Sequence, residues 1–538
     1  MAWHAERKYY AHESRTGPRL TLEQADRVRD DARLPGERDP RSVVLTVLAA
    51  GAVLRFLLAE SIGLGVDESY AVAVARVFSV SYFDHPPLHF WLVGAMAKLA
   101  HSESREVVRF PFVACFALTT WLMYRLTAQL FGDRAGALAA VLLNISAVFS
   151  ISTGGWVLPD GPLMMLMLAS TSVIAGLLFH ETPPHPTSRW ALAGLLAGLA
   201  MLAKYHGVFV LAGTFLFLLT SAAHRRWLRR PGPYLGALIA FACLTPVVVW
   251  NREHGWVSFA FQAGRAMGRG GIHVGSMLTN IAGQAAWVLP WIWLPLVVVL
   301  GLAVRAGPSG GRRWFLVCLG IGPIVGFTLI ALRGDVGLPH WQAPGYLMLF
   351  PLLGAAAAAR LERGDPLARR WLRASVVGFL ALVLLLGSHT ATGWLGRVFP
   401  AAFAKGDPTA DTADWYALRA ALQARGLIPL DGFVAAPSWI QAGKAAVGLG
   451  PDVKVLCLCA DPHHFYYMQN DSSWLGANAV IVKKETLNDD VIAEFAPYFE
   501  EIRPLDVVPV TRAGHVAMMV RLYRANGFRR LFPTAQPR

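Results

Sequence analysis

The stretch SVVLTVLAAGAVLRFLLAESIGLGVDESY, residues 42–70, joins an apolar segment to an acidic pair. Its first part, residues 42–60, is long and apolar enough to cross the hydrocarbon core of a bilayer, which takes about 20 residues as a helix. Asp67 and Glu68 follow directly after that segment. Because ionisable side chains are costly inside lipid, we expect both carboxylates to lie just beyond the end of a membrane-spanning helix.

Composition extends this prediction to the whole chain. Of the 538 residues, 55% are hydrophobic and only 16% are charged, whereas soluble domains carry about 25% charged residues. The net charge of +14 does not indicate nucleic acid binding, because the arginines occur in short clusters between apolar spans. We therefore predict a polytopic α-helical membrane protein with about eleven transmembrane helices, at residues 42–60, 106–130, 134–152, 159–180, 189–203, 205–223, 232–250, 276–304, 314–332, 343–360 and 372–392. The segments 189–203 and 205–223 are separated only by KYH, so they form either one bent element or two short ones.

The connections between these spans indicate which way the helices run. The connections 224–231, 305–313 and 360–373 are basic, and basic loops stay in the cytoplasm. With eleven helices they fall on the side of the polar N-terminal tail, residues 1–41, which we expect to be cytoplasmic. The long first loop, residues 61–105, and the chain after about residue 393 are then periplasmic. Within that loop, the amphipathic stretch after the acidic pair is predicted to lie flat in the membrane interface.

Ionisable residues gather on the predicted periplasmic side. The segment YFDHPP presents Asp84 and His85 before two prolines, which stop any helix. Asp160 could simply cap the helix that follows it, and Lys204 could snorkel between two apolar segments. Outer loops normally avoid Arg and Lys, so the cations kept here predict an anionic ligand. The candidate substrate-binding residues are His85, Asp160, Lys204, Tyr205, Arg269, Arg333 and His340.

These motifs, in this order, resemble polytopic glycosyltransferases of the GT-C class. The acidic pair, YFDHPP, PDGPL (159–163), AKYHG (203–207) and PHWQAPGY (339–346) are similar to the bacterial branch of the dolichyl-phosphate-mannose protein mannosyltransferase superfamily. That branch includes aminoarabinose transferases and galacturonic acid transferases that modify lipid A and lipopolysaccharide core. The resemblance covers most of residues 42–393, which would form a GT-C catalytic domain in the bacterial inner membrane.

The resemblance implies a polyprenyl-phosphate sugar donor, a lipid or glycan acceptor, and inverting transfer on the periplasmic face. It implies catalytic roles for Asp67, Glu68 and Asp84, with Asp67 as the base. The aminoarabinose transferases have Lys where this chain has His85. Because His is only partly charged at neutral pH, phosphate binding would pass to Lys204, Arg269 or Arg333, and the sugar is expected to differ.

For such a reaction the protein must mainly supply charged groups and hold the two substrates in position. The leaving group is a phosphate, which cations can stabilise without a strong general acid. A hydroxyl acceptor benefits from a base, whereas a phosphate acceptor needs only to be oriented. The sequence identifies no definite cofactor, and a divalent metal near Asp84, His85 and His340 is an alternative that these ligand types allow.

Residues 394–538 differ in composition and predict a periplasmic α/β domain. The segments GFVAAPSW, VKVLCLCA, NAVIVKKE and HVAMMVRLYR are typical of strands, and residues 414–427 of an amphipathic helix. Cys457 and Cys459 would face the same way on a strand. With the histidines that follow, CLCADPHH is either a metal site or, as we favour, a buried strand ending in a turn. The domain would cover the active face or hold the acceptor.

Two other functions remain open from the sequence. A transporter or flippase of an anionic lipid-linked substrate is the main alternative, but it should carry ionisable residues at mid-membrane and an internal repeat. The ionisable residues here lie at helix ends, and we see no repeat. An oligosaccharide ligase or polymerase would share the outer arginines, but the early carboxylate pair argues against it.

Overall fold

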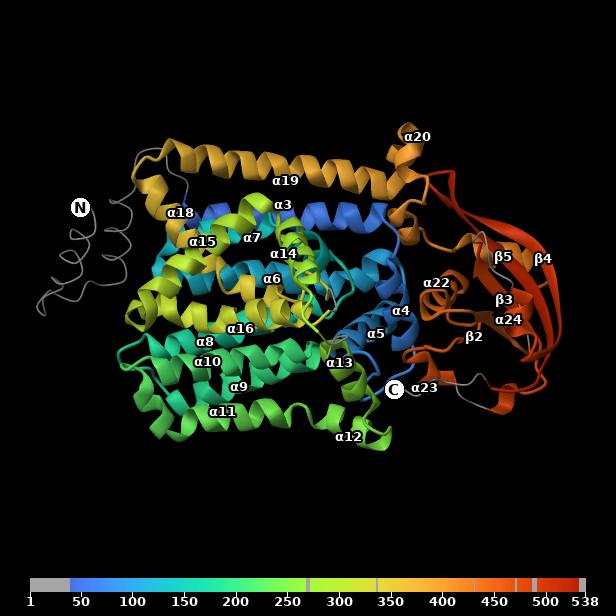
Figure 1. Ribbon diagram of the computed structural model, residues 1–538, viewed down its shortest axis with the longest axis horizontal. Helices are drawn as coiled ribbons and strands as arrows, with labels where there is room; N and C mark the ends of the chain where they lie inside the picture. The colour runs from blue at the N-terminus through green and yellow to red at the C-terminus, as the bar shows by residue number, and fades with distance from the viewer. Residues whose placement is uncertain are drawn as a thin grey trace, which may run out of the picture.

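The protein is described by a computed structural model, which covers residues 39–267, 271–334, 337–429, 431–469, 472–485 and 491–531. Most of the predicted N-terminal tail, residues 1–41, lies outside the described residues. The described chain forms an elongated helical bundle with an α/β domain at one end (Figure 1). This arrangement confirms the predicted fold class, a polytopic helical membrane protein with a C-terminal α/β domain.

The bundle is built from apolar helices, each of which satisfies its own backbone hydrogen bonds, as a lipid environment requires. Its largest buried cluster includes Phe149, Phe217, Phe315 and Phe350. The helices are α3 (Pro40–Ser61), α6 (Arg105–Phe131), α7 (Asp133–Asn144), α8 (Asp160–Leu178), α9 (Pro186–Ala203), α10 (Val208–Thr220), α11 (Pro231–Ala242), α12 (Thr245–Glu253), α13 (Val257–Met267), α14 (Val274–Val288), α15 (Pro290–Ala306), α16 (Arg312–Leu332), α17 (Ala343–Leu347), α18 (Phe350–Glu362) and α19 (Pro366–Thr392).

By length and composition, seven helices of the described chain could cross a membrane, and the bent pair α11 and α12 would make an eighth. The eleven predicted spans exceed this number because three of them do not form helices that are both long enough and apolar enough to cross a membrane. The span 134–152 becomes the 12-residue α7 followed by a π-helical turn at Val148–Thr153. The spans 189–203 and 205–223 become the 18-residue α9 and the 13-residue α10.

Two breaks in the backbone explain further differences from the predicted spans. Lys204 is extended, with φ −157° and ψ 140°, and a 3-10 turn follows it, so α9 and α10 are two separate elements. The predicted span 276–304 is also divided, because Leu289 has a φ of 80° and Pro290 then starts α15. In both places a turn interrupts a run that is apolar enough for one helix.

The two ends of the bundle differ in character. The connections that follow α10, α15 and α18 lie at the end opposite the C-terminal domain (Figure 1). These are the three basic connections that the sequence assigns to one side of the membrane. The first loop lies at the other end, beside the C-terminal domain.

The first loop, residues 61–105, folds into two helices, α4 (Val66–Ala75) and α5 (Leu88–Ala100). The prediction that the stretch after the acidic pair lies flat in the interface is wrong, because every residue of α4 from Glu68 to Ala75 is buried. It is buried because α4 packs between α5 and the C-terminal domain. Val77 and Phe78, just past the end of the helix, are exposed.

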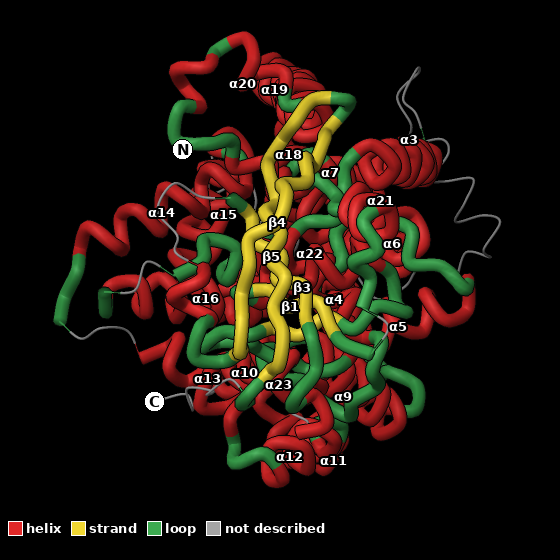
Figure 2. Tube along the Cα trace, turned by 90° about the vertical axis from the view of Figure 1, so that its right-hand side faces the viewer, coloured by secondary structure: helices red, strands yellow, loops and turns green. Residues whose placement is uncertain are grey.

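The C-terminal domain contains a five-stranded mixed sheet in the order β2-β1-β3-β5-β4, which crosses the end of the bundle (Figure 2). The parallel strands are β1 (Phe433–Ala436), β2 (Val455–Cys457) and β3 (Ala479–Lys484), and β5 (His515–Phe528) pairs antiparallel with both β3 and β4 (Phe499–Arg512). Four strands were predicted. The fifth, β4, was missed because Pro504 and Pro509 interrupt its pattern. The helices are α20 (Trp394–Val398), α21 (Ala417–Ala424), α22 (Trp439–Leu449), α23 (Phe465–Gln469) and α24 (Val491–Phe495).

Helix α22 fixes this domain to the first loop. A Cβ at Gly443 would lie 2.8 Å from the Tyr70 backbone nitrogen, so the two helices approach closely only because Gly443 has no side chain. A single buried cluster runs from α4 through α22 to the sheet, and it includes Tyr70, Val74, Ala442 and Val434. The helix that carries the acidic pair is therefore held on one side by the C-terminal domain.

Candidate functional site

Two cavities lie at the end of the bundle that faces the C-terminal domain. One, here called the charged cavity, has a volume of about 740 Å³ and is lined by Asp84, Asp160, Lys204 and Arg265 among others. The second, here called the apolar cavity, has a volume of about 620 Å³ and is lined by Leu58 of α3 and by Phe379, Leu382, Val383 and Leu386 of α19. Five residues line both, namely Asp67, Ser152, Trp156, Leu158 and Trp287.

Asp67 is the carboxylate at the junction of the two cavities. It occupies the first turn of α4 and is exposed to the cavity space. Within the part of the chain that the structure describes, its carboxylate makes no hydrogen bond. Burial, followed by the charges of Asp84 and Glu68, raises the pKa of Asp67, while His463 and Arg265 partly oppose the rise. A carboxylate that is accessible, unpaired and more basic than usual is suited to accept a proton.

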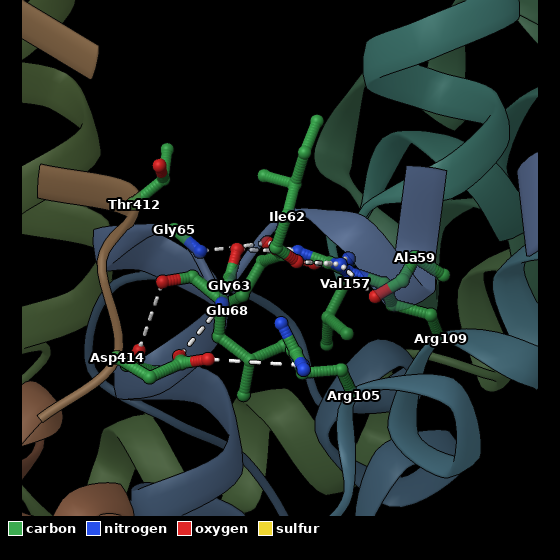
Figure 3. Close-up of polar contacts among 12 residues, drawn as sticks. Ala59, Ile62, Gly63, Gly65, Glu68, Arg105, Arg109, Val157, Thr412 and Asp414 are labelled. Atoms are coloured by element: carbon green, nitrogen blue, oxygen red, sulfur yellow. Dashed lines mark hydrogen bonds and ion pairs between the residues drawn. The ribbon is translucent and has the colours of Figure 1, made fainter. Parts of the chain in front are cut away.

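Glu68 has the opposite surroundings (Figure 3). Its two oxygens accept hydrogen bonds from Arg109 Nε and Nη2 at 2.8 and 2.6 Å, and from the backbone N–H groups of Val157 and Gly65 at 3.0 and 2.8 Å. Burial alone would raise the pKa of Glu68, but Arg109 and the backbone donors bring it below its ordinary value. Each oxygen of Glu68 thus accepts two hydrogen bonds from the protein, and its catalytic role stays a prediction.

Arg109 joins Glu68 to the end of the first bundle helix (Figure 3). Its Nη1 donates to the carbonyls of Ala59 and Ile62 at 3.1 and 2.7 Å, and its Nη2 donates to Gly63 at 2.9 Å. Ala59 lies in the last turn of α3, where carbonyls lack helical partners, and Ile62 and Gly63 directly follow that helix. One buried arginine thus sets the angle between α3 and α4, and with it the position of Asp67.

The C-terminal domain contacts the same junction. Asp414 accepts a hydrogen bond from Leu64 N–H at 2.9 Å, and Lys444 of α22 donates to the Leu64 carbonyl. A Cβ at Gly63 would lie 2.3 Å from the Thr412 carbonyl, so this approach also requires glycine (Figure 3). The segment between α3 and α4 is therefore enclosed by both domains.

Asp84 is buried, and a hydrogen-bonded link to the C-terminal domain holds its side chain in place. Its Oδ1 accepts a hydrogen bond from the Tyr70 hydroxyl at 2.8 Å, and that hydroxyl accepts one from the His464 backbone N–H at 3.0 Å. Burial raises the pKa of Asp84, although His463 and the Tyr70 hydroxyl oppose the rise. The pKa of Tyr70 is itself raised by burial and by Asp84, so the tyrosine stays protonated and donates a hydrogen bond to Asp84. Asp84 is thus fixed in the cavity wall.

Asp160 and Lys204 form a buried ion pair. The Lys204 ammonium donates to both Asp160 oxygens at 3.0 Å, which uses two of its three N–H groups. The pair joins the start of α8 to the end of α9 and lines the charged cavity beside Tyr205. The structure favours this pairing over a plain helix cap for Asp160 or a snorkelling Lys204.

Two predicted histidines line the same cavity in an uncharged form. Burial, together with the charge of the nearby Lys204, lowers the pKa of His340 to about 4. Burial, with His89 and Lys204, brings the pKa of His85 well below its ordinary value. At neutral pH both rings can exchange hydrogen bonds with a substrate, but neither supplies a positive charge for a phosphate.

Arg265 of α13 is a second cation that lines the charged cavity, beside Lys204. It lies over the rings of Phe261 and Trp341, at 5.5 and 5.2 Å, and no carboxylate pairs with it in the described part of the chain. The predicted phosphate-binding Arg333 is exposed and lines neither cavity, so the structure does not bring it to the site. The other, Arg269, lies outside the described residues.

Three further residues of the site were not selected from the sequence. Arg265 lies in the same outer loop as Arg269, and only the fold distinguishes the two. Arg55 of α3 lines the apolar cavity and donates to neutral acceptors, Ser150 and Asn144. In the sequence, Arg55 differs from its neighbours as the one arginine inside the apolar segment 42–60. His463 reaches the charged cavity from the C-terminal domain, and no local pattern connects it to the first loop.

Neither metal site considered from the sequence is formed. No group of three or more His, Cys, Asp or Glu side chains with metal-binding geometry occurs among the described residues. Cys457 and Cys459 follow the favoured interpretation: the first is buried at the end of β2, both are free thiols, and their sulfurs are 3.1 Å apart.

Parts of the chain are similar in sequence to known proteins. Residues 84–250 match the family described as dolichyl-phosphate-mannose-protein mannosyltransferase. Over 310 residues, the chain is 26% identical to an undecaprenyl phosphate-alpha-4-amino-4-deoxy-L-arabinose arabinosyl transferase of Pseudomonas aeruginosa (strain LESB58), covering 54% of this chain and 52% of that protein. Over 286 residues it is 23% identical to a lipid A galacturonosyltransferase of Rhizobium johnstonii, covering 52% of this chain and 58% of the relative. The chain thus spans about half the length of the curated relatives it matches.

The likeness to solved structures extends over more of the chain. The crystal structure of ArnT from Cupriavidus metallidurans bound to undecaprenyl phosphate superposes with a TM-score of 0.59 at 16% identity, covering 89% of this chain and 97% of that one. Its apo form gives a TM-score of 0.58 at 14% identity. The fold is therefore that of ArnT, and the resemblance predicted from the sequence is confirmed.

Proposed function

We propose that the chain is a glycosyltransferase that moves a sugar from a polyprenyl phosphate donor to lipid A or another cell-envelope acceptor. The observation that carries this proposal is the place of Asp67, where a charged cavity and an apolar cavity meet. The reaction would take place at the periplasmic face of the bacterial inner membrane. The relatives support it, since their names include an undecaprenyl phosphate-linked sugar and lipid A.

The charged cavity suits the phosphate and sugar of the donor. Arg265 and the third N–H of Lys204 are the groups that can bind the phosphate and stabilise its charge as it leaves. The apolar cavity between α3 and α19 suits a lipid chain of the acceptor, and Arg55 within it can meet an acidic headgroup. The two substrates would then meet beside Asp67.

In this scheme the acceptor oxygen attacks the anomeric carbon of the sugar while the bond to the phosphate breaks. A single displacement of this kind inverts the anomeric configuration. Asp67 accepts the proton of an acceptor hydroxyl, a role consistent with its raised pKa and its free oxygens. If the acceptor is a phosphate, which is already anionic, Asp67 orients it instead.

The other predicted site residues receive supporting roles. Asp84 orients the sugar from the wall that Tyr70 and His464 fix. His85, Tyr205 and His340 offer neutral hydrogen bonds, and Asp160 holds Lys204. Glu68 is a positioning residue for Asp67 rather than a catalytic residue. Binding of phosphate by Arg269 stays a prediction.

A transfer assay with the purified full-length protein tests this function. The protein is mixed with lipid A and with undecaprenyl phosphate carrying either 4-amino-4-deoxy-L-arabinose or galacturonic acid. We expect one donor to yield glycosylated lipid A and free undecaprenyl phosphate in equal amounts. A transporter or flippase would form no new covalent bond, so the absence of product with both donors, in a preparation that binds them, would contradict a role in lipid A modification.

A further inference from the structure

His463 brings the C-terminal domain into the charged cavity. Three described residues of that domain line the cavity, namely Trp439, Asp461 and His463. The first begins α22 and the other two belong to the turn after β2. The domain is therefore a wall of the cavity as well as a cover over it.

The turn is built to hold the His463 ring in one orientation. The ring stacks on Trp439, with centroids 4.6 Å apart and planes 24° from parallel. Its Nε2 lies 3.3 Å from Asp461 Oδ2, and only 13% of the side chain is exposed. The backbone of His463 has a φ of 52°, a left-handed conformation that is uncommon for residues other than glycine. Strain of this kind persists where surrounding contacts enforce it, and it clusters at binding sites.

One polar atom of this arrangement lacks a partner. His463 Nδ1 is buried, and no group within the described residues makes a hydrogen bond to it. A buried polar atom without a partner costs stability, whereas a hydrogen bond to a bound molecule would remove that cost. The ring also lies close to Tyr70 and Phe83, both at 5.8 Å between centroids, so it adjoins the wall that holds Asp84.

The neighbouring residue locks the turn onto the first loop. His464 donates its backbone N–H to the Tyr70 hydroxyl at 3.0 Å, and its Nδ1 accepts a hydrogen bond from Phe83 N–H at 3.2 Å. Its ring packs against Tyr82, with centroids 4.6 Å apart. Because the Tyr70 hydroxyl also donates to Asp84 Oδ1, these contacts set the distance between His463 and Asp84. The pair can therefore face one ligand from two domains.

The three residues together offer an aromatic face, a carboxylate and an imidazole. These groups match a sugar ring, which presents C–H groups to an aromatic face and hydroxyl groups to polar side chains. They lie in the same cavity as Asp67 and Arg265. We propose that Trp439, Asp461 and His463 form a subsite for the sugar ring of the polyprenyl-linked donor. This inference rests on the proposed function and assigns the C-terminal domain a part in choosing the sugar.

A comparison of two ligands that differ only in the sugar tests the subsite. The probes are undecaprenyl phosphate and undecaprenyl phosphate carrying the sugar that supports transfer, measured for binding to the purified full-length protein. The variants are His463→Asn, since Asn tolerates the left-handed conformation, and Trp439→Leu. The matched control is His515→Asn, an exposed histidine at the start of β5.

We expect both subsite variants to bind the glycosylated lipid about tenfold more weakly, the effect of losing one good hydrogen bond or ring contact. Their affinity for undecaprenyl phosphate and all properties of the control should stay within about twofold of wild type. Equal losses for both lipids would overturn the subsite, because they would point to phosphate binding or domain docking. Unchanged binding of both lipids would also overturn it while leaving the proposed function intact. A wild-type protein that binds neither lipid would refute both.

Discussion

Asp67 and Glu68 are adjacent in α4, yet their surroundings differ. Asp67 faces cavity space without a hydrogen bond to a described residue, and Glu68 is enclosed by Arg109 and two backbone donors. The sequence could predict that this pair lies at the membrane surface, because it follows an apolar span. It could not separate the roles, since the partners of Glu68 come from α6 and from the segment before α8.

The two carboxylates give a matched pair of substitutions. Asp67→Asn should lower the rate of sugar transfer by about a hundredfold or more, the usual contribution of a placed base, without lowering the unfolding temperature. Glu68→Gln should destabilise the protein by about 3 kcal/mol, because it leaves Arg109 buried without its counter-charge. Transfer assays and thermal unfolding of the purified variants measure both effects. An active Asp67→Asn protein would remove Asp67 from the mechanism.

The pH dependence of transfer reports on the same residue. Burial and the charges of Asp84 and Glu68 raise the pKa of Asp67 above its ordinary value of 3.8. A base acts only when it is deprotonated, so activity should be lost as the pH falls through this raised pKa. We expect the acidic limb of kcat/KM to lie above pH 3.8 and to be absent from the residual activity of Asp67→Asn. The same limb in both proteins would assign it to another group.

Among the elements, the packing of α4 against α22 is the main feature that the sequence did not predict. The spans themselves were predictable from apolar length, and seven predicted site residues line the charged cavity, namely Asp67, Asp84, His85, Asp160, Lys204, Tyr205 and His340. They converge because each follows or precedes a span on one side of the membrane. The burial of α4 was not predictable, because its apolar face fits an interface with lipid as well as an interface with α22.

The contact between these two helices is testable through Gly443. Gly443→Leu would force a side chain against the Tyr70 backbone, where even a Cβ would lie 2.8 Å from nitrogen. The domain should move away from α4, break the link from His464 to Tyr70, and lower transfer by more than tenfold, with faster proteolysis between the domains. Arg425→Leu adds the same side chain at an exposed position beyond α21 and should have neither effect. Wild-type activity in Gly443→Leu would show that docking is not needed for transfer.

In the molecule as a whole, both cavities and the C-terminal domain lie at the same end of the bundle, which we propose to be the periplasmic end. The distribution of Arg predicted this polarity, and the fold agrees, since the basic connections lie at the opposite end of the bundle (Figure 1). The position of the domain over the cavities depends on contacts such as Lys444 with Leu64 and Asp414 with Leu64. Single side chains so far apart in sequence leave no local pattern from which to predict them.

Topology mapping checks this placement. A reporter fused to the C-terminus should be active only as a periplasmic protein, and a tag inserted at Ser309, in the exposed turn between α15 and α16, should be accessible only from the cytoplasm. The C-terminal reporter and the Ser309 tag should report opposite sides of the membrane, so each serves as the control for the other. A C-terminal reporter that reads cytoplasmic would reverse the orientation and place the cavities on the wrong side for this reaction.

We propose that this chain attaches a sugar to the cell envelope, with Asp67 as the base. The most direct test of this proposal is mass spectrometry of lipid A and core oligosaccharide from a deletion strain that carries the wild-type gene, the Asp67→Asn gene or none. We expect one sugar mass to be lost on deletion, restored by the wild-type chain, and not restored by Asp67→Asn present at an equal level. Identical lipid A and core in all three strains would contradict the account.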